Sequence, residues 1–160
     1  MSSSTTTDPS SNSKDERALS ALEGRVALSY EPLNPQAVEA LALRDAHGGV
    51  LTFTGRVRDH NEGEGVVGIR YEAYESMALS ELKAILEEAD ARFSEALSVT
   101  HHRLGELKVG DIAVVVSVSA PHRAVTFECC SWIISELKAR VPIFKHELRE
   151  SGQVWVGLGP

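Results

Sequence analysis

The sequence lacks several patterns that mark common protein classes. Its only two cysteines, Cys129 and Cys130, are adjacent, which is too few for a disulfide framework or a zinc cage. The longest apolar stretch, about Ile112 to Ala120, is far shorter than the roughly 20 residues of a membrane span. A Gly-rich phosphate loop, a serine nucleophile elbow, CxxC and HExxH are all missing. A disulfide scaffold and a membrane-spanning helix are therefore excluded.

Positive charge is also scarce. The chain has 16 Lys and Arg against 23 Asp and Glu, a net charge of -7 at pH 7. A general nucleic-acid coat needs a basic surface, so we expect no nucleic-acid partner. The same balance still permits a small basic pocket for an anion.

Residues 1–17 differ in composition from the rest of the 160-residue chain. They contain six Ser and three Thr and almost nothing apolar, so they cannot bury enough surface to offset the entropy of ordering. Organelle transit peptides share this composition, but the first thirteen residues carry no Lys or Arg. We therefore expect a disordered leader over 1–17 and one domain over 18–160, in a soluble cytoplasmic protein.

Periodicity and turn residues predict an α+β fold. Asn34 and Pro35 are typical of a helix start, and that helix ends before Gly48. Further helices are predicted at 77–93 and 122–140, and strands at 25–30, 50–57, 66–74, 98–104, 112–120, 143–149 and 153–156. Three helices are too few for a doubly wound sheet. We expect antiparallel-rich sheets, a hairpin between 50–57 and 66–74, and an exposed, mobile loop at 59–65.

Two pairs of basic residues at element ends are candidates for anion binding. Arg56 and Arg58 end a strand at the mouth of the loop, where they are either site residues or two solvated cations. His122 and Arg123 open a helix, whose free N–H groups and dipole attract anions. A positively charged arginine at this end is unfavourable for the helix, because the helix dipole is also positive there. Its presence indicates either an anion bound between Arg123 and the helix N-terminus or a nearby carboxylate that neutralises Arg123.

A third pair, Lys138 and Lys145, flanks Pro142. Lys138 lies in the last turn of a helix, where a cation suits the dipole and needs no further explanation. Lys145 lies in a mixed strand and is harder to explain. If the proline turn brings both amines together, each lowers the pKa of the other toward the range of a catalytic lysine. Trp132, Trp155 and the two cysteines are expected to pack rather than react.

Five segments together resemble one known family. They are FTGRVRDHNEG (Phe53 to Gly63), YEAY (Tyr71 to Tyr74), HRLGEL (His102 to Leu107), SAPHR (Ser119 to Arg123) and LKARVPIFKHE (Leu137 to Glu147). In order and spacing, over about Arg25 to Trp155, they resemble the large, catalytic subunit of molybdopterin synthase.

The resemblance implies a fold and a reaction. The fold would be of the α/β-hammerhead type. The family converts cyclic pyranopterin monophosphate into molybdopterin by installing two dithiolene sulfurs, without a metal or organic cofactor. Sulfur arrives as a thiocarboxylate on the Gly-Gly tail of a small ubiquitin-like subunit. The assembly is a heterotetramer with a homodimer of large subunits at its centre.

The resemblance also implies roles for particular residues. His122 and Arg123 match a pair that contacts the substrate. The segment Arg56, Val57 and Arg58 matches another substrate-contacting stretch, as do His146 and Glu147. Lys138 and Lys145 match two lysines central to catalysis, which would also contact substrate. They would hold the thiocarboxylate and shuttle protons, with Lys138 a candidate for a transient covalent bond to the glycine terminus.

Three positions depart from the family pattern. Phe144 stands where Trp is common, and His146 where Lys or Arg is common, which weakens the local positive field at neutral pH. Some bacterial members carry an arginine shortly after this tryptophan that reaches the neighbouring subunit's site. Here Val-Gly-Leu-Gly-Pro follows Trp155 instead, and Arg149 is one candidate to replace that arginine.

Two other functions share the same motifs. One is a non-enzymatic binding module for a phosphorylated metabolite, and the other is a scaffold for a ubiquitin-like partner. Since the chain keeps both lysines and the His-Arg pair, the sequence favours an enzyme.

Overall fold

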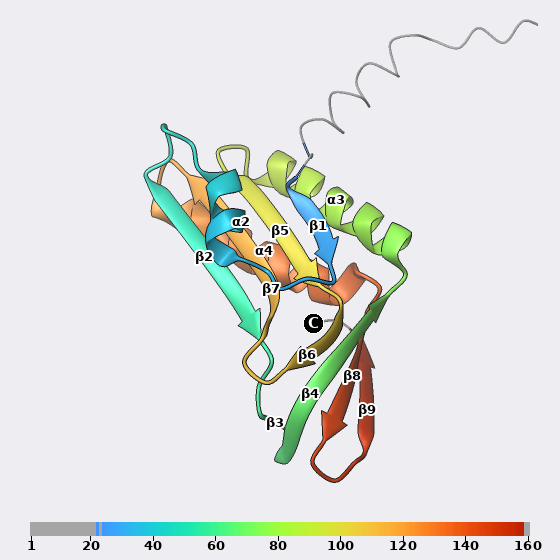
Figure 1. Cartoon of the computed structure of the whole chain (residues 1–160). Coiled ribbons are helices and arrows are strands. Elements are labelled where there is room, and N and C mark those ends of the chain that lie inside the picture. The colour runs from blue at the N-terminus through green and yellow to red at the C-terminus, as the bar shows by residue number, and fades with distance from the viewer. Residues whose placement is uncertain (1–21, 23, 159–160) are drawn as a thin grey trace, which may run out of the picture.

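The computed structural model describes residue 22 and residues 24–158, so the expected leader over 1–17 lies outside the described residues. Its elements are β1 (Val26–Ser29), α2 (Pro35–Ala42), β2 (Gly49–Arg56), β3 (His60–Asn61), β4 (Glu64–Ala73), α3 (Glu75–Arg92), β5 (Leu97–Arg103), β6 (Gly105–Lys108), β7 (Ile112–Ala120), α4 (Arg123–Arg140), β8 (Ile143–Arg149) and β9 (Val154–Leu158). The predicted α+β class is confirmed (Figure 1).

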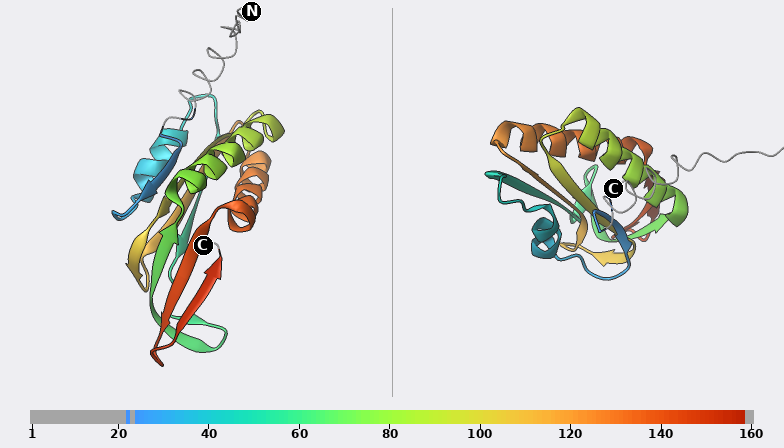
Figure 2. Two further views of the ribbon diagram at one scale, coloured as in Figure 1. Left: turned by 90° about the vertical axis from the view of Figure 1, so that its right-hand side faces the viewer. Right: turned by 90° about the horizontal axis from the view of Figure 1, so that it is seen from above.

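A four-stranded sheet with the order β1-β5-β7-β2 forms one part of the molecule. Strand β7 pairs antiparallel with both β5 and β2, whereas β1 runs parallel to β5. Helices α3 and α4 cover one face of this sheet and α2 covers the other (Figures 1 and 2).

The core divides between the two faces because side chains alternate along a strand. Val114, Val116 and Val118 of β7 belong to the main core with α3 and α4. Val115, on the opposite face, packs in a smaller cluster with Val38 of α2.

A second sheet extends beyond the first and carries the C-terminal strands (Figure 1). Its order is β3-β4-β8-β9, and β6 pairs with β4 as well. The predicted C-terminal hairpin is confirmed, with β8 and β9 antiparallel and Gly152 at a positive φ of 83° in the turn.

The expected hairpin between 50–57 and 66–74 is wrong. Strand β2 pairs with β7, and β4 pairs with β3, β6 and β8. The chain reverses inside the expected loop, where Glu62 and Gly63 have positive φ values of 52° and 80°. This turn makes 59–65 the tip of a β3–β4 hairpin instead of an irregular loop.

The helix boundaries follow the expected signals. Asn34 Oδ1 accepts hydrogen bonds from the N–H groups of Gln36 and Ala37, at 3.0 and 3.3 Å, and Pro35 occupies the first turn of α2. Helix α4 ends at Arg140, before Val141 and Pro142. No helix in the described part of the chain is both long and apolar enough to cross a membrane.

Candidate active site

The end of β2 is held firmly where it enters the candidate site. Arg56 Nε donates to the Gly110 carbonyl at 3.0 Å. The Val57 N–H donates to the Asp111 carbonyl, and the Gly110 N–H donates to the Val57 carbonyl. The Val57 side chain is buried in the main core. Arg56 and Val57 therefore fix the chain, and Arg58 is exposed immediately beyond them.

Lys145 lies on the inner side of the second sheet. It stands opposite Tyr71 of β4 and opposite Gly157 of β9, and its Nζ lies 5.5 Å from the centre of the Trp155 ring. Burial lowers the pKa of the Lys145 amine. The charge of Glu147 opposes this shift, while the charges of Arg58 and Lys138 lower the pKa further.

The turn at Pro142 brings the two lysines within range of each other. Lys138 is exposed near the end of α4, and only Val141 and Pro142 separate that helix from β8. The Tyr74 N–H donates to the Pro142 carbonyl at 3.3 Å and ties the turn to the end of β4. The charge of Lys138 contributes to the lowered pKa of Lys145, which is the direction expected for two amines held close together.

Glu147 is the acidic member of this group. Its side chain shares a face of β8 with Lys145, two residues away, and the residue is 3% exposed. Asn61 Nδ2, from β3, donates to Glu147 Oε2 at 2.9 Å. Arg58, Lys138, Lys145 and Glu147 with Asn61 form what we call the lysine cluster.

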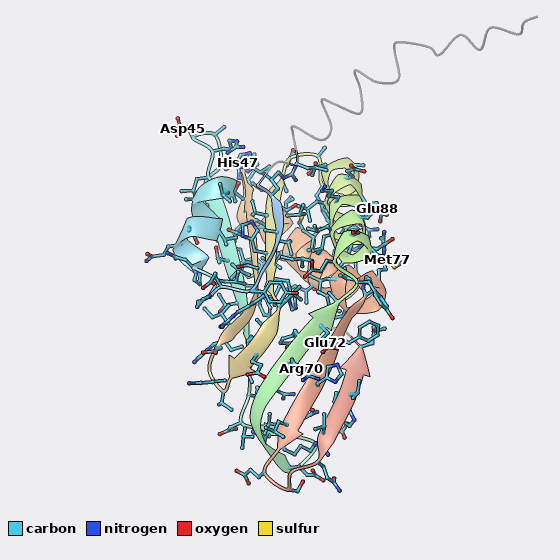
Figure 3. All side chains as sticks on the ribbon, turned by 45° about the vertical axis from the view of Figure 1, so that its right-hand side comes forward. Asp45, His47, Arg70, Glu72, Met77 and Glu88 are labelled. Atoms are coloured by element: carbon cyan, nitrogen blue, oxygen red, sulfur yellow. The ribbon has the colours of Figure 1, made fainter. Side chains whose placement is uncertain are left out.

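His146 faces away from the lysine cluster, since neighbouring residues of a strand point to opposite sides. Its Nε2 lies 3.2 Å from Glu72 Oε2 on the outer face of the sheet. Glu72 also contacts Arg70, and Figure 3 shows the two side by side along β4. The presence of His146 instead of a Lys or Arg therefore affects the electrostatic field on the outer face of the sheet more than the field at Lys145.

His122 and Arg123 lie far from the lysine cluster within one chain. Arg123 begins α4, with its backbone against Gly49 at the start of β2. Along α4, Arg123 and Lys138 are about 22 Å apart at 1.5 Å per residue. The sequence grouped these residues in one site, and a single copy of the chain does not bring them together.

The two side chains are nevertheless available to a ligand. Both are exposed, and His122 makes no side-chain cap to α4. Within the described residues, Arg123 has no ion pair within 4.0 Å, so the alternative of a neighbouring carboxylate that neutralises it is not supported.

Arg149 is not placed to act as an arginine that reaches a neighbouring subunit. Its Nη1 donates to Glu64 Oε2 at 2.8 Å, and its side chain is 10% exposed. The guanidinium is thus held inside its own chain, next to the β3–β4 hairpin, and is not free to reach another subunit.

Two residues of the site had no assigned role in the sequence. Asn61 was part of a recognised motif, but its bond to Glu147 joins residues 86 positions apart. Trp155 was expected only to pack, and it lies in contact with the Lys145 amine. The one signal in the sequence was that Trp155 sits in a strand expected to pair with the strand of Lys145.

Comparison with known proteins settles the family. The model of the MoaE protein family matches residues 28–140. The chain belongs to the MoaE family. It is 41% identical over 136 residues to the molybdopterin synthase catalytic subunit of Pyrococcus abyssi, covering 84% of this chain and 92% of that one. It is 40% identical over 133 residues to catalytic subunit 1 of Mycobacterium tuberculosis, covering 83% and 90%.

Solved structures agree with the MoaE assignment. Molybdopterin synthase from Staphylococcus aureus superposes with a TM-score of 0.77 at 33% identity, covering 81% of this chain and 95% of that one. The MoaE protein of Burkholderia ambifaria gives 0.73 at 25% identity, covering 85% and 91%. The predictions of the family, of an enzyme and of a role in molybdenum cofactor biosynthesis are thereby confirmed.

Proposed function

We propose that this chain carries out the sulfur-transfer step of molybdopterin synthase on the lysine cluster. The substrate is cyclic pyranopterin monophosphate, and the sulfur donor is the C-terminal thiocarboxylate of a small ubiquitin-like subunit. One observation carries the proposal: the half-buried Lys145 lies close enough to Arg58, just beyond β2, and to Lys138, on α4, for the charges of both to lower the pKa of its amine.

The cluster suits an anionic donor and a step that moves protons. Arg58 and Lys138 are exposed cations that can hold a thiocarboxylate and a phosphate. Lys145 has a lowered pKa, so a larger fraction of its amine is neutral near pH 7 and able to accept a proton. At each delivery the sulfur forms a bond to a substrate carbon as a carbon–oxygen bond at that carbon breaks, and the departing oxygen leaves as phosphate oxygen or as water. Water then cleaves the acyl–sulfur bond and leaves a carboxylate tail. Two deliveries complete the dithiolene.

The distance between the two basic groups supports a homodimer. His122 and Arg123 are separated from Lys138 by about 22 Å of helix, so they join the lysine cluster only if a second copy of the chain supplies them. Val50 and Phe127, close to this end of α4, are 40% and 59% exposed. Exposed apolar side chains of this size are typical of a surface that a second subunit covers. Each site would then take its lysines from one copy and its His-Arg pair from the other.

The small subunit is the second partner in the proposal. A protein of this fold from Helicobacter pylori is described as a complex of subunits 1 and 2 of molybdopterin-converting factor, with a TM-score of 0.67 at 18% identity. That likeness shows the fold alone. The cytoplasm is the compartment we infer, because the cysteines are free and buried and thiols stay reduced there.

A reconstituted reaction tests the proposal. The chain is mixed with a thiocarboxylated small subunit and cyclic pyranopterin monophosphate, and the dithiolene product is measured after oxidation to its fluorescent derivative. We expect product with the native chain and a loss of at least about 100-fold in kcat for Lys145→Ala. Lys83→Ala, on α3 and outside the lysine cluster, is the control and should keep full activity.

Two outcomes would contradict the proposal. One is a stable complex with the small subunit that gives no product, which would favour a scaffold. The other is a Lys145→Ala variant that loses substrate binding and turnover to the same extent, which would favour a binding module for a phosphorylated metabolite.

A further inference from the structure

The hydrogen bond between Asn61 and Glu147 joins the tip of one hairpin to β8, the strand that carries Lys145. Asn61 lies on β3, a two-residue strand that pairs with the first residues of β4. Glu147 lies on β8 and is almost fully buried. The Asn61 amide is the only side-chain donor within hydrogen-bond distance of this carboxylate among the described residues.

The position of Glu147 makes this bond unusual. A buried carboxylate normally pairs with the nearest cation, because an unpaired buried charge is costly. Lys145 is two residues away on the same face of β8, yet the two side chains form no ion pair within 4.0 Å in the described structure. The carboxylate is directed to Asn61 instead.

We propose that Asn61 is a positioning residue that holds the Glu147 carboxylate away from Lys145 and so keeps the lysine amine free. The inference rests on the proposed function for its consequence in catalysis. With Asn61 in place, the Lys145 amine is available to the thiocarboxylate or to a proton. Without it, the buried carboxylate turns to its nearest cation and forms an ion pair with Lys145.

The groups around Lys145 give the direction of the effect. Arg58, beyond β2, and Lys138, on α4, lower the pKa of Lys145, whereas Glu147 raises it. Tyr71 stands opposite on β4 and is neutral at physiological pH, because burial and the charge of Glu147 raise its pKa to about 12. Closer approach of Glu147 therefore raises the pKa of Lys145.

Titration of Lys145 by NMR in the full chain tests this without any catalytic assay. Lysines are labelled with ¹³C, and the Lys145 signal is assigned by its loss in Lys145→Arg. We expect Asn61→Ala to raise the pKa of Lys145 by about one unit. His60→Ala is the matched control, because His60 is the adjacent residue of β3 and, among the described side chains, its ring forms a hydrogen bond only with Asp59.

A double-mutant cycle shows whether Asn61 acts through Glu147. In a Glu147→Gln background, Asn61→Ala should no longer change the pKa of Lys145. An unchanged or lowered pKa in the single variant overturns the proposal, and so does an equal rise in both backgrounds. Asn61→Gln, which keeps the amide donor, should restore much of the native value and guards against a variant that misfolds.

The reconstituted reaction supplies the catalytic readout. Asn61→Ala should move the rising limb of the pH–kcat profile by the same amount as the pKa of Lys145, with a smaller change in KM. If the native chain makes no product while the NMR shifts appear as expected, the proposed function fails and the positioning role of Asn61 stands. If product forms but neither the pKa nor the profile moves, the positioning role fails alone.

Discussion

At the scale of single residues, burial shifts the titration of two basic side chains in this protein. The pKa of Lys145 is lowered mainly by burial. His102, buried at the end of β5, has its pKa lowered to about 4 for the same reason. The two residues differ in use. Lys145 lies among other charges in the candidate site, whereas His102 donates a hydrogen bond from Nδ1 to the Arg103 carbonyl and packs edge-on against Tyr71.

His102 should make the fold sensitive to acid. Its folded-state pKa lies below the unfolded value of 6.5, so the unfolded chain binds the proton more tightly. Stability is therefore lost as the pH falls from about 6.5 to about 4, by about 3 kcal/mol at most. We expect His102→Gln to be less stable than the native chain at pH 7 and to show a flatter decline over this range.

Urea unfolding at several pH values between 7 and 4 measures this effect. His101→Gln, at the half-buried neighbour on the same strand, is the control and should leave the native pH dependence intact. An identical decline in the native chain and in His102→Gln would show that His102 is not the group responsible.

At the scale of elements, α4 connects the two basic groups and needs a fixed position. Arg140, two residues beyond Lys138, binds Glu88 of α3 through two nitrogens at 2.7 and 2.9 Å. It also contacts Glu81 of α3 and Glu136 of its own helix, each at 3.3 Å. The guanidinium thus fixes the end of α4 against α3, directly before the turn that leads to Lys145.

Loss of this contact should weaken the packing of α3 on α4. We expect Arg140→Ala to lower the free energy of unfolding by about 1–2 kcal/mol, more than a typical surface ion pair, because one guanidinium serves three carboxylates. Arg140→Lys should recover less than half of the free energy of unfolding that is lost in Arg140→Ala, since an ammonium cannot form the paired contacts to Glu88. Chemical denaturation of the native chain and the two variants measures their order of stability. If both variants were as stable as the native chain, the prediction would be contradicted.

Helix starts could be predicted from the sequence, whereas the pairing of strands could not. The start of α2 at Asn34 and Pro35 was predictable because capping is a local interaction. The partner of β2 was not, because alternation says which side of a strand is buried and not which strand lies beside it. For the same reason the motifs assigned roles to Arg58, Lys138, Lys145 and Glu147, but did not indicate the bond from Asn61 to Glu147. That bond depends on how two distant hairpins meet.

At the scale of the whole molecule, the basic residues divide into two groups at opposite ends of α4. The family resemblance assigned substrate contacts to His122, Arg123 and the lysines alike, because motifs give order along the chain and not distance in space. The fold separates them by about 22 Å. In the proposed dimer this separation means that every site is shared between two copies.

Shared sites predict complementation between two inactive variants. Arg123→Ala and Lys145→Ala should each be inactive alone. In a mixed dimer, one site receives both substitutions and the other receives neither, so one of two sites is native. After unfolding, equal mixing and refolding with the small subunit, activity should return to roughly one quarter of the native value, because half of the dimers are mixed.

The control for this experiment pairs Lys138→Ala with Lys145→Ala. Both residues belong to the same copy's lysine cluster, so every site of their mixed dimer carries a defect and activity should stay absent. Recovery in both mixtures, or in neither, would contradict a site shared between copies.

The separation of His122 and Arg123 from the lysines also has a genetic consequence. In a dimer with a native chain, a chain that carries both Arg123→Ala and Lys145→Ala would inactivate both sites. One site would lack Lys145, and the other would lack the Arg123 that this chain should supply. When it is produced in excess beside the native chain, such a doubly altered chain should act as a dominant inhibitor of cofactor synthesis. Either single substitution would spare one site in each mixed pair and should behave as a largely recessive allele.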